Sequence, residues 1–503
     1  MFPFKNNIVL VRNSNRNLYL QLCDQIIGFI KSGKLPPSTK LPGSRKLAES
    51  LSVHRKTVIS AYEELISQGW IETIPTKGTF VTSSLPIVNP KNFVQPVLQN
   101  NIKEKSGFSF LTRSHLIRKP KHKIDQKMLV VDDGCPDHRL APIEEIAKVY
   151  RNITKKSHYE NLLTYNSTYG NLELRKSLVT YLNQTRGLHI TVDNILITRG
   201  SQMGIYLNSQ LLLSAKNKVI VVGNTNYMTA DNTFKEAGAR IEQVPVDDQG
   251  LDTNAIEKLC KIKQINAVYT TSHHHHPTTV TLSAERRMHL LQLAQYYNFA
   301  IIEDDYDYDF HYNNAPILPL ASNDDHGNVI YIGGFTKIIA PAIRIGYLIA
   351  PKDFVGEAAR LRRIIDRQGD TLLEQTLAQM ISTGDVQRHC NKVLKIYKTR
   401  RDLFCSLLKE KLGDYFDFEI PKGGMAIWVK LNKAYNWDVI CNEAEKLDIE
   451  LNPDWRRYDN DNSRHNGIRM GFASLNEEEI REVIERLVKV FELVKQKHNK
   501  LIT

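Results

Sequence analysis

One lysine in this sequence stands between two apolar runs, where an amine is suited to covalent chemistry. Lys337 lies in the stretch 329–350, VIYIGGFTKIIAPAIRIGYLIA, in which a strand-like run leads through a small-residue turn to the lysine and a second strand-like run follows. Partial removal from water disfavours the ammonium form, which is what Schiff-base chemistry requires. A lysine at a strand end that keeps its amine in solvent is the alternative.

Polar groups that suit a pyridine cofactor flank this lysine. An apolar run upstream ends in acids and tyrosines, AIIEDDYDYDF from residue 300, as strands of open α/β sheets end at a ligand crevice. A carboxylate there could keep a pyridinium nitrogen protonated, and a tyrosine could donate to a phenolate oxygen. Arg344, seven residues after the lysine, could bind a phosphate. Together these groups predict a site for pyridoxal phosphate (PLP).

The EDDYD block, the FTK around the lysine and the RIGYL that follows resemble fold-type I aminotransferases, specifically the aminotransferase-like domain of MocR/GabR-type regulators. The resemblance implies that Lys337 forms the Schiff base with PLP and that Arg344 binds the phosphate. It also implies Asp304 as the partner of the pyridine nitrogen and Tyr306 as the phenolate donor. Thr336 would assist at the phosphate.

Three more segments resemble cofactor-binding parts of that domain. A predicted strand over 195–198 runs into RGSQMG, a small-residue turn that opens a helix and presents backbone N–H groups to a phosphate, which points to Ser201 and Gln202. Tyr227 falls where the family has a tyrosine that stacks on the pyridine ring, although the usual neighbouring proline is absent. Tyr165 matches a tyrosine that reaches the cofactor phosphate of the neighbouring subunit.

Four consecutive histidines, HHHH at 273–276, raise the question of a metal site. Adjacent residues of one short loop cannot all face one ion, and no other cluster of ligands accompanies them, so we expect no metal. The segment resembles the family's SHQ(F/Y)PTG loop, which puts His276 beside the phenolate face of the cofactor. His275 and Thr279 replace the glutamine and the glycine of that loop.

An arginine near the C-terminus is the candidate for an effector carboxylate. NGIRMGFA at 466–473 resembles the family strand whose arginine binds a substrate carboxylate with both of its terminal nitrogens, which selects Arg469. Arg456 and Arg457 are the alternatives in a nearby loop.

The N-terminal region has the element order of a winged helix-turn-helix. Periodic apolar residues predict a helix over 18–32, and a second helix is predicted from Ser44, its expected cap, to residue 51. After a Ser-Val turn, a third helix is predicted over 54–65 with a basic and polar first turn, and two short strands over 69–74 and 79–82 follow.

This region resembles the GntR-family DNA-binding domain over nearly the whole module. The resemblance implies double-stranded DNA as the partner. Its contacts would be Arg45 and Lys46 with phosphates, Arg55, Lys56 and Thr57 in the major groove, and Lys77 at the wing.

The excess positive charge lies in the first quarter of the chain. The net charge is +12, and residues 1–84 hold 11 Lys and Arg against 5 Asp and Glu, while residues 85–127 hold 9 against 2. The remainder is nearly balanced, so a polyanion is expected to bind the N-terminal part alone, with nucleic acid as the leading candidate and a membrane surface as the alternative. The basic run RKPKHK at 118–123 is either part of a solvated tether or an additional contact with DNA phosphates.

The chain is too long for one ordinary core, at 503 residues. We expect an α/β protein with a winged helix-turn-helix over 14–84, a basic linker over 85–127 and a fold-type I aminotransferase-like domain over 128–503, whose small subdomain begins near 363. No apolar run approaches the roughly 18 to 20 residues that cross a bilayer. Six scattered cysteines without CxxC spacing predict a reducing, cytoplasmic setting and neither disulfides nor metal sites.

These features predict a PLP-dependent transcription regulator of the MocR/GabR kind that senses an amine, an amino acid or PLP itself. The resemblance implies a head-to-tail homodimer in which each winged helix lies over the partner's effector domain. An active aminotransferase that carries a DNA-binding module is the alternative, since Lys337 is intact. A DNA-binding protein whose pocket no longer holds a cofactor is a third possibility.

Overall fold

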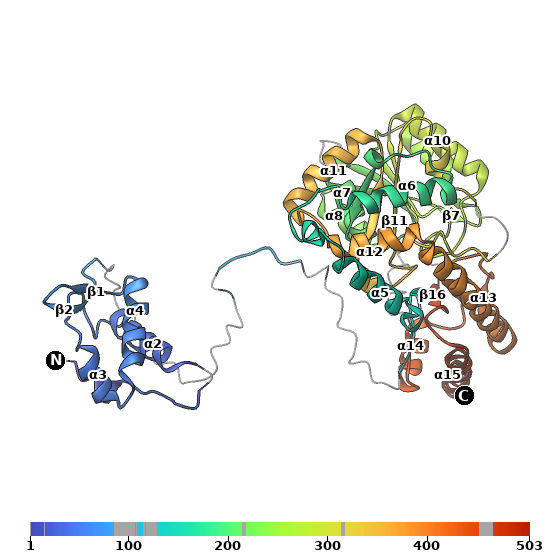
Figure 1. Ribbon diagram of the computed structural model, residues 1–503. Coiled ribbons are helices and arrows are strands. Elements are labelled where there is room, and N and C mark those ends of the chain that lie inside the picture. Colours follow the sequence, from blue (N-terminus) through green and yellow to red (C-terminus); the bar gives the residue numbers. More distant parts are fainter. Residues whose placement is uncertain are drawn as a thin grey trace. The chain divides into compact units, whose positions relative to one another are not determined.

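The computed structural model describes residues 2–14, 16–84, 106, 108–113, 116, 128–213, 218–312, 317–451 and 466–502, with side chains to 496. The basic run at 118–123, most of the expected linker, and Arg456 and Arg457 lie outside these ranges. The chain divides into two compact units, Met1–Arg113 and Ser114–Thr503, whose relative placement is not determined (Figure 1).

The N-terminal unit has four helices and one two-stranded sheet among its described residues. They are α1 (Phe4–Asn7), α2 (Leu18–Lys31), α3 (Ser44–Leu51), α4 (Arg55–Ser67), β1 (Ile71–Ile74) and β2 (Gly78–Val81). The strands pair antiparallel, with Ile71 opposite Val81. One apolar face of each helix is buried in a common core that includes Leu22, Leu47 and Val58. The expected helix-turn-helix followed by a wing is confirmed in element order.

Two helices begin at a different residue than expected, at Ser44 and near His54. Ser44 is the first residue of α3 and not its cap; Gly43 takes the cap position, without a side-chain hydrogen bond. The Ser44 hydroxyl instead lies 3.4 Å from Arg55 Nε, across the turn. His54 was expected inside the third helix, but it caps α4, with its Nδ1 accepting from the Lys56 N–H. A cap residue has extended backbone angles, which composition alone does not distinguish from the first helical turn.

A seven-stranded mixed sheet forms the centre of the C-terminal unit, in the order β4-β12-β11-β10-β9-β5-β6. Strand β12 is antiparallel to both neighbours and the other pairs are parallel. The strands are β4 (Ile195–Thr198), β5 (Val219–Gly223), β6 (Arg240–Val244), β9 (Ala267–Thr270), β10 (Ala300–Asp304), β11 (Val329–Gly334) and β12 (Gly346–Ile349).

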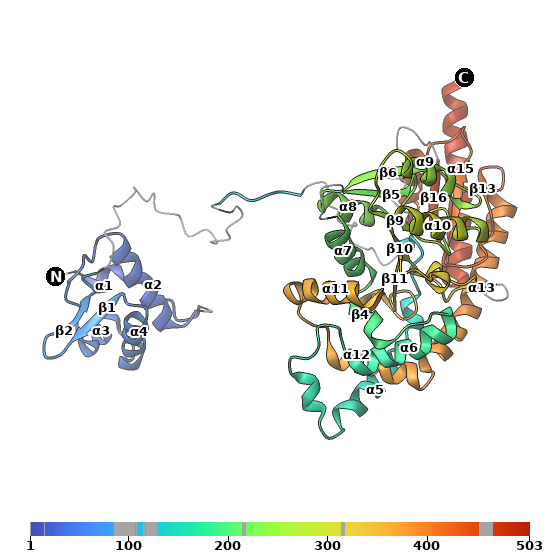
Figure 2. The same cartoon turned by 90° about the horizontal axis from the view of Figure 1, so that it is seen from above.

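Helices cover both faces of this sheet (Figures 1 and 2). Strand side chains alternate between the faces: Ile195 and Ile197 pack with one group of helices, whereas Leu196 packs with the other. One group is α7 (Ser201–Leu212), α8 (Met228–Glu236) and α11 (Lys352–Ile365); the other is α5 (Ile143–Thr154), α6 (Leu172–Arg186), α9 (Thr253–Cys260), α10 (Ala284–Tyr297) and α12 (Thr371–Ser382). Burial on both faces explains why the strands are almost continuously apolar.

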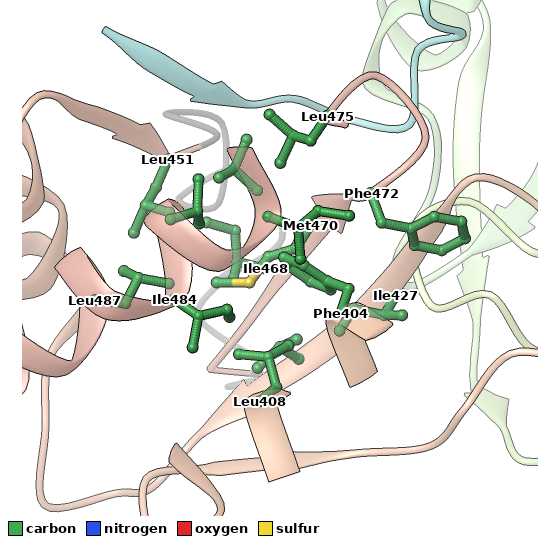
Figure 3. Packing of buried hydrophobic residues seen from close by; sticks show 14 of the residues in the cluster. Phe404, Leu408, Ile427, Leu451, Ile468, Met470, Phe472, Leu475, Ile484 and Leu487 are labelled. Carbon is green, nitrogen blue, oxygen red and sulfur yellow. The ribbon is translucent and has the colours of Figure 1, made fainter. Parts of the chain in front are cut away.

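A second, smaller sheet lies in the C-terminal part of this unit. Its order is β13-β14-β16, formed by Phe416–Phe418, Ala426–Leu431 and Gly467–Gly471. Ile468 and Met470 of β16 pack against Phe404 of α13 (Asp385–Leu412) and Ile484 of α15 (Glu477–Ile502) (Figure 3). Strand β3 (Leu129–Val131) pairs in parallel with β15 (Ile449–Leu451), which follows α14 (Trp437–Lys446). The first strand of the unit, β3, is therefore paired with a strand that lies more than three hundred residues later in the chain.

None of the helices in the described ranges is long and apolar enough to cross a membrane.

Candidate cofactor site and nucleic-acid interface

The carboxyl edge of the large sheet brings most of the predicted cofactor residues together. Asp304 ends β10, Lys337 follows the neighbouring strand β11 by three residues, and Ser201 opens α7 after β4. Strands β4, β10 and β11 run in the same direction, because β12 between β4 and β11 is antiparallel to both. Ligands of open α/β sheets bind at this edge, so the topology places these groups at one crevice.

Lys337 is half-buried and lies beside the start of the unit. Its Nζ donates to the Gly134 carbonyl oxygen at 2.5 Å. Thr336, the residue before it, is also half-buried. Among the described residues, this is the one hydrogen bond of the amine. The residue before Gly134, Asp133, accepts from Arg469 of β16 through its carbonyl oxygen.

Asp304 offers an unused acceptor. Its Oδ2 accepts from the Tyr269 hydroxyl at 2.8 Å, whereas its buried Oδ1 has no hydrogen-bond partner. Burial raises the pKa of Asp304 to about 7, and the hydrogen bond from Tyr269 opposes that rise. A buried acceptor without a partner fits a donor supplied by a ligand, such as a protonated ring nitrogen.

The pKa of Asp304 predicts a pH-dependent stability. Because its folded-state pKa lies above the unfolded value, the carboxyl favours the folded state most at low pH and loses that contribution as pH rises toward 7. Asparagine cannot ionise, so the free energy of unfolding of the PLP-free Asp304→Asn variant lacks this pH dependence. Relative to the native chain, it should therefore rise by about 2 kcal/mol when the pH is raised from about 5.5 to about 8.5. Denaturant unfolding at both pH values measures this; an equal difference at both would contradict it.

Arg344 lies against the loop that opens α7. The arginine has a left-handed φ of 50° and its Nη2 donates to the Arg199 carbonyl oxygen at 2.8 Å. Gly200 has a φ of 79°, and a Cβ there would lie 2.8 Å from Arg344 Nη2. A guanidinium beside a helix N-terminus is a cradle for a phosphate, with Ser201 as the first helical residue. Gln202 donates to Thr233 Oγ1 at 2.7 Å, and its buried Oε1 has no partner.

Gly200→Ala should therefore weaken cofactor binding. The methyl group would push Arg344 from its place and strain a left-handed backbone, and we expect the dissociation constant for PLP to rise about tenfold or more. Gly356→Ala is the matched control, because a Cβ at that helical position meets only the Tyr169 hydroxyl at 3.8 Å. Absorbance titration with PLP measures both; unchanged affinity in Gly200→Ala would separate this loop from the phosphate.

Three rings line the other side of the site. Tyr227 and His276 meet edge to face, with centroids 5.2 Å apart, and His276 lies 6.3 Å from the Tyr306 ring. The Tyr306 hydroxyl donates to the His274 carbonyl oxygen at 2.9 Å and accepts from Arg469 Nη2 at 3.2 Å. The phenolate contact expected of Tyr306 would thus require its hydroxyl to exchange the His274 carbonyl for a ligand.

The four histidines turn to four different partners. Their partners are Asp305 for His273, Asp307 for His274, Thr278 for His275 and Asp133 for His276. Across the described ranges, no group of three or more His, Cys, Asp or Glu is arranged to hold a metal ion. Thr279, where the related loop has glycine, adopts a φ of 63°, a left-handed conformation that is strained for a β-branched residue.

Arg469 reaches the same site from the small sheet. Its side chain is buried, with Nη1 donating to the Pro277 carbonyl oxygen at 3.1 Å and Nε lying 3.3 Å from both the carbonyl oxygen and Oδ1 of Asp133. Tyr165 is elsewhere: its ring is 76% exposed and lies 3.9 Å below the Arg367 guanidinium.

The predicted DNA-contacting residues lie on α3, on the first turn of α4 and between β1 and β2. Five of the six are exposed and Thr57 is half-buried: Arg45, Lys46, Arg55, Lys56 and Lys77. Lys56 and Thr57 line a cavity of about 420 Å³ together with Arg12 and Arg16 from the segment before α2. Arg12 Nη2 donates to the Ser52 carbonyl oxygen in the turn between α3 and α4, whereas Arg16 pairs with Asp24 at 2.6 Å.

Family models match both of the domains that the sequence predicts. The family model "Aminotransferase class I and II" matches residues 134–487. The chain belongs to that family. The model "Bacterial regulatory proteins, gntR family" matches residues 18–81, so this family member carries an N-terminal GntR domain, as the sequence motifs predicted.

Two relatives that match nearly the whole chain are named as regulators. The probable rhizopine catabolism regulatory protein MocR of Rhizobium meliloti is 24% identical over 96% of each chain, and the uncharacterized HTH-type transcriptional regulator YisV of Bacillus subtilis is 29% identical over 92% of this chain and 93% of its own. A crystal structure of Pyrococcus horikoshii kynurenine aminotransferase in complex with PMP matches 73% of this chain and 91% of that one, with 28% identity and a TM-score of 0.68. The expected MocR-type domain combination, the fold-type I aminotransferase fold and PLP as its cofactor are confirmed.

Two residues of this family member were not anticipated from sequence. Asp133 contacts both Arg469 and His276, and Arg12 shares a cavity with Lys56. A carboxylate just before the Gly-Cys-Pro-Asp segment was visible as a charge, but its partner is 336 residues away. Arg12 is one of several basic residues before the first long helix, and nothing in its spacing distinguishes it.

Proposed function

We propose that this chain is a transcription regulator that binds operator DNA through its GntR domain and senses an amine, an amino acid or PLP through its aminotransferase domain. The observation that carries the proposal is the meeting of Lys337, Arg344 and the unpaired oxygen of Asp304 at one sheet edge in a chain with an intact DNA-binding domain. A protein that binds operator DNA would work in the cytoplasm, and we propose that location.

The residues at the sheet edge fit the cofactor. Bound PLP supplies a carbonyl carbon that reacts with amines and a protonated ring that draws electrons from it. Lys337 would hold the cofactor covalently, Asp304 Oδ1 would keep the ring nitrogen protonated, and Arg344 with the N-terminus of α7 would bind the phosphate. Tyr227 and His276 would border the ring, Tyr306 would face its phenolate oxygen, and Thr336, Ser201 and Gln202 would complete the phosphate site.

Effector binding would couple two parts of the effector domain. Lys337 belongs to the large sheet, whereas Arg469 lies on β16 of the small sheet. A ligand that bridges Lys337 and the paired Arg469 and Asp133 favours one arrangement of the two sheets over others and so shifts their equilibrium. We propose that this movement repositions the DNA-binding domains of a head-to-tail homodimer. The exposed Tyr165 would reach the cofactor phosphate of the other subunit there.

At the DNA, the first turn of α4 would enter the major groove. Arg55, Lys56 and Thr57 would face base edges, while Arg45, Lys46 and Lys77 would contact phosphates. Arg12 is the addition that the structure suggests to this set, because it borders the same cavity as Lys56. Two modules in a dimer favour repeated or palindromic half-sites.

A working aminotransferase remains the second candidate, favoured by the family match and by the intact Lys337. The test combines DNA and cofactor. DNA fragments selected by the purified PLP-loaded protein from a random library are titrated with native protein and Lys337→Ala, with and without PLP and amines. The proposal predicts equal basal DNA binding and a ligand response only in the native protein. Identical DNA affinity under all conditions in the native protein would reject it.

A further inference from the structure

The chain places a carboxylate of its own where an effector's carboxylate would bind. Asp133 Oδ1 lies 3.3 Å from Arg469 Nε, and its Oδ2 lies 3.0 Å from His276 Nε2. The Asp133 side chain is 36% exposed, whereas that of Arg469 is only 1% exposed. Asp133 is therefore the member of this pair that is accessible from outside.

The backbone around Asp133 is held in place. Asp132 Oδ1 accepts from the N–H groups of Gly134 and Cys135, both at 2.8 Å, and the Asp132 carbonyl oxygen accepts from Gly471 at the end of β16 at 2.7 Å. The carbonyl oxygen of Gly134, the residue after Asp133, accepts from Lys337 Nζ. The position of the Asp133 carboxylate thus follows from a fixed turn on the small sheet and lies next to the reactive lysine.

Arg469 has little left to offer to a ligand. Its donors face the Asp133 carboxylate and carbonyl oxygen, the Pro277 carbonyl oxygen and the Tyr306 hydroxyl. A ligand with a single carboxylate must displace Asp133 and would then face a like charge beside it. Two carboxylates at one guanidinium repel each other, and breaking a buried ion pair is costly.

Asp133 itself stays charged. Burial raises its pKa, but the neighbouring His276, Arg469 and Lys337 more than offset this and hold the pKa of Asp133 at about 2. A carboxylate has about four acceptor sites, whereas Oδ2 meets only His276 Nε2 and the buried Oδ1 lies beside Arg469 without a hydrogen bond, so acceptor capacity remains. The complementary group for that side is a cation with N–H donors.

We propose that Asp133 recognises a second cationic nitrogen of the effector, so that this site takes a diamine or a diamino acid in preference to ligands with one amine. One amine of such a ligand faces Lys337 and the cofactor, and the other donates to Asp133, which remains paired with Arg469. The inference rests on the proposed function, because it assumes that the effector binds at this cofactor site.

The test uses two matched pairs of ligands, putrescine with butylamine and ornithine with norvaline, in which only the second amine differs. The PLP-loaded full-length protein is titrated with each by calorimetry, with the cofactor's absorption spectrum as a second readout. We expect the member with two amines to bind about tenfold more tightly in at least one pair, and the pair that responds distinguishes a diamine from a diamino acid. In Asp133→Asn the preference should fall to about twofold or less, while Asp325→Asn, which removes an exposed carboxylate, should keep it.

Butylamine and norvaline binding as tightly as their partners in the native protein would overturn the inference without recourse to any variant. The same holds if Asp133→Asn retains the native preference. If none of the four ligands binds while PLP remains attached, the second-amine inference fails and the proposed PLP-dependent function stands. If PLP itself does not attach to the native protein, the proposed function fails as well.

Discussion

Lys337→Ala is expected to abolish covalent attachment of PLP completely. Lys337 is the amine at the carboxyl edge of the sheet beside Asp304 and Arg344, and alanine has no nitrogen to replace it. After reduction with borohydride and dialysis, mass spectrometry should find the cofactor's mass added to the native chain and none added to the variant.

Lys433→Ala serves as the control, because this lysine is exposed in a segment that follows β14. It should retain the cofactor as the native chain does. If Lys337→Ala still acquires the full mass of one cofactor, the attachment point is another lysine and the proposed site is wrong.

The double substitution Arg55→Ala with Lys56→Ala should strongly weaken DNA binding. Each residue is exposed in the first turn of α4, and loss of a base or phosphate contact costs about 1 to 3 kcal/mol, so together the affinity should fall on the order of a hundredfold or more. Fluorescence anisotropy on a selected DNA fragment measures this at several salt concentrations, and the salt dependence should also become shallower.

A control with the same change in charge is available in the other unit. Lys409→Ala with Lys411→Ala removes two exposed positive charges from the end of α13. This variant should bind DNA as the native chain does. If it weakens binding as much as the α4 variant, the effect reflects total charge, and α4 is not the recognition helix.

The main site residues could be predicted because each follows a recognisable strand. Asp304 ends an apolar run, Ser201 opens a helix after another, and Lys337 follows a third. Parallel strands end at the same edge, so local patterns were enough to bring these residues together. The family resemblance assigned their roles, and the sheet topology explains why residues 33 and more positions apart meet.

The contacts of Asp133 could not be predicted in this way. They depend on the pairing of β3 with β15 and on the turn that Asp132 holds against β16, interactions that join the start of the unit to its end. No periodicity within a short window records such pairings. The acceptor of the Tyr306 hydroxyl could not be predicted either, because it is the His274 carbonyl oxygen, a backbone group that every residue carries.

The start of α3 at Ser44 also differs from the prediction, which had this serine as the helix cap. Serine is a preferred helix cap, so cap preference predicted that α3 begins at the residue after Ser44. The helix instead begins at Ser44 itself, whose hydroxyl lies beside Arg55 Nε. Leu47 and Ala48 of α3 pack in the same core as Val58 of α4, a tertiary contact that helix-cap preference does not include. Local propensity and tertiary packing differ here by a single residue.

The most direct test of a regulator that senses amines is the absorption spectrum of the PLP-loaded protein during titration with amines and amino acids, with released keto acid assayed in the same samples. The account predicts a cofactor band that shifts and then persists, no keto acid beyond background, and a change in affinity for the selected DNA over the same concentration range. Loss of the band with one equivalent or more of keto acid, and no change in DNA affinity, would contradict it and identify a working aminotransferase.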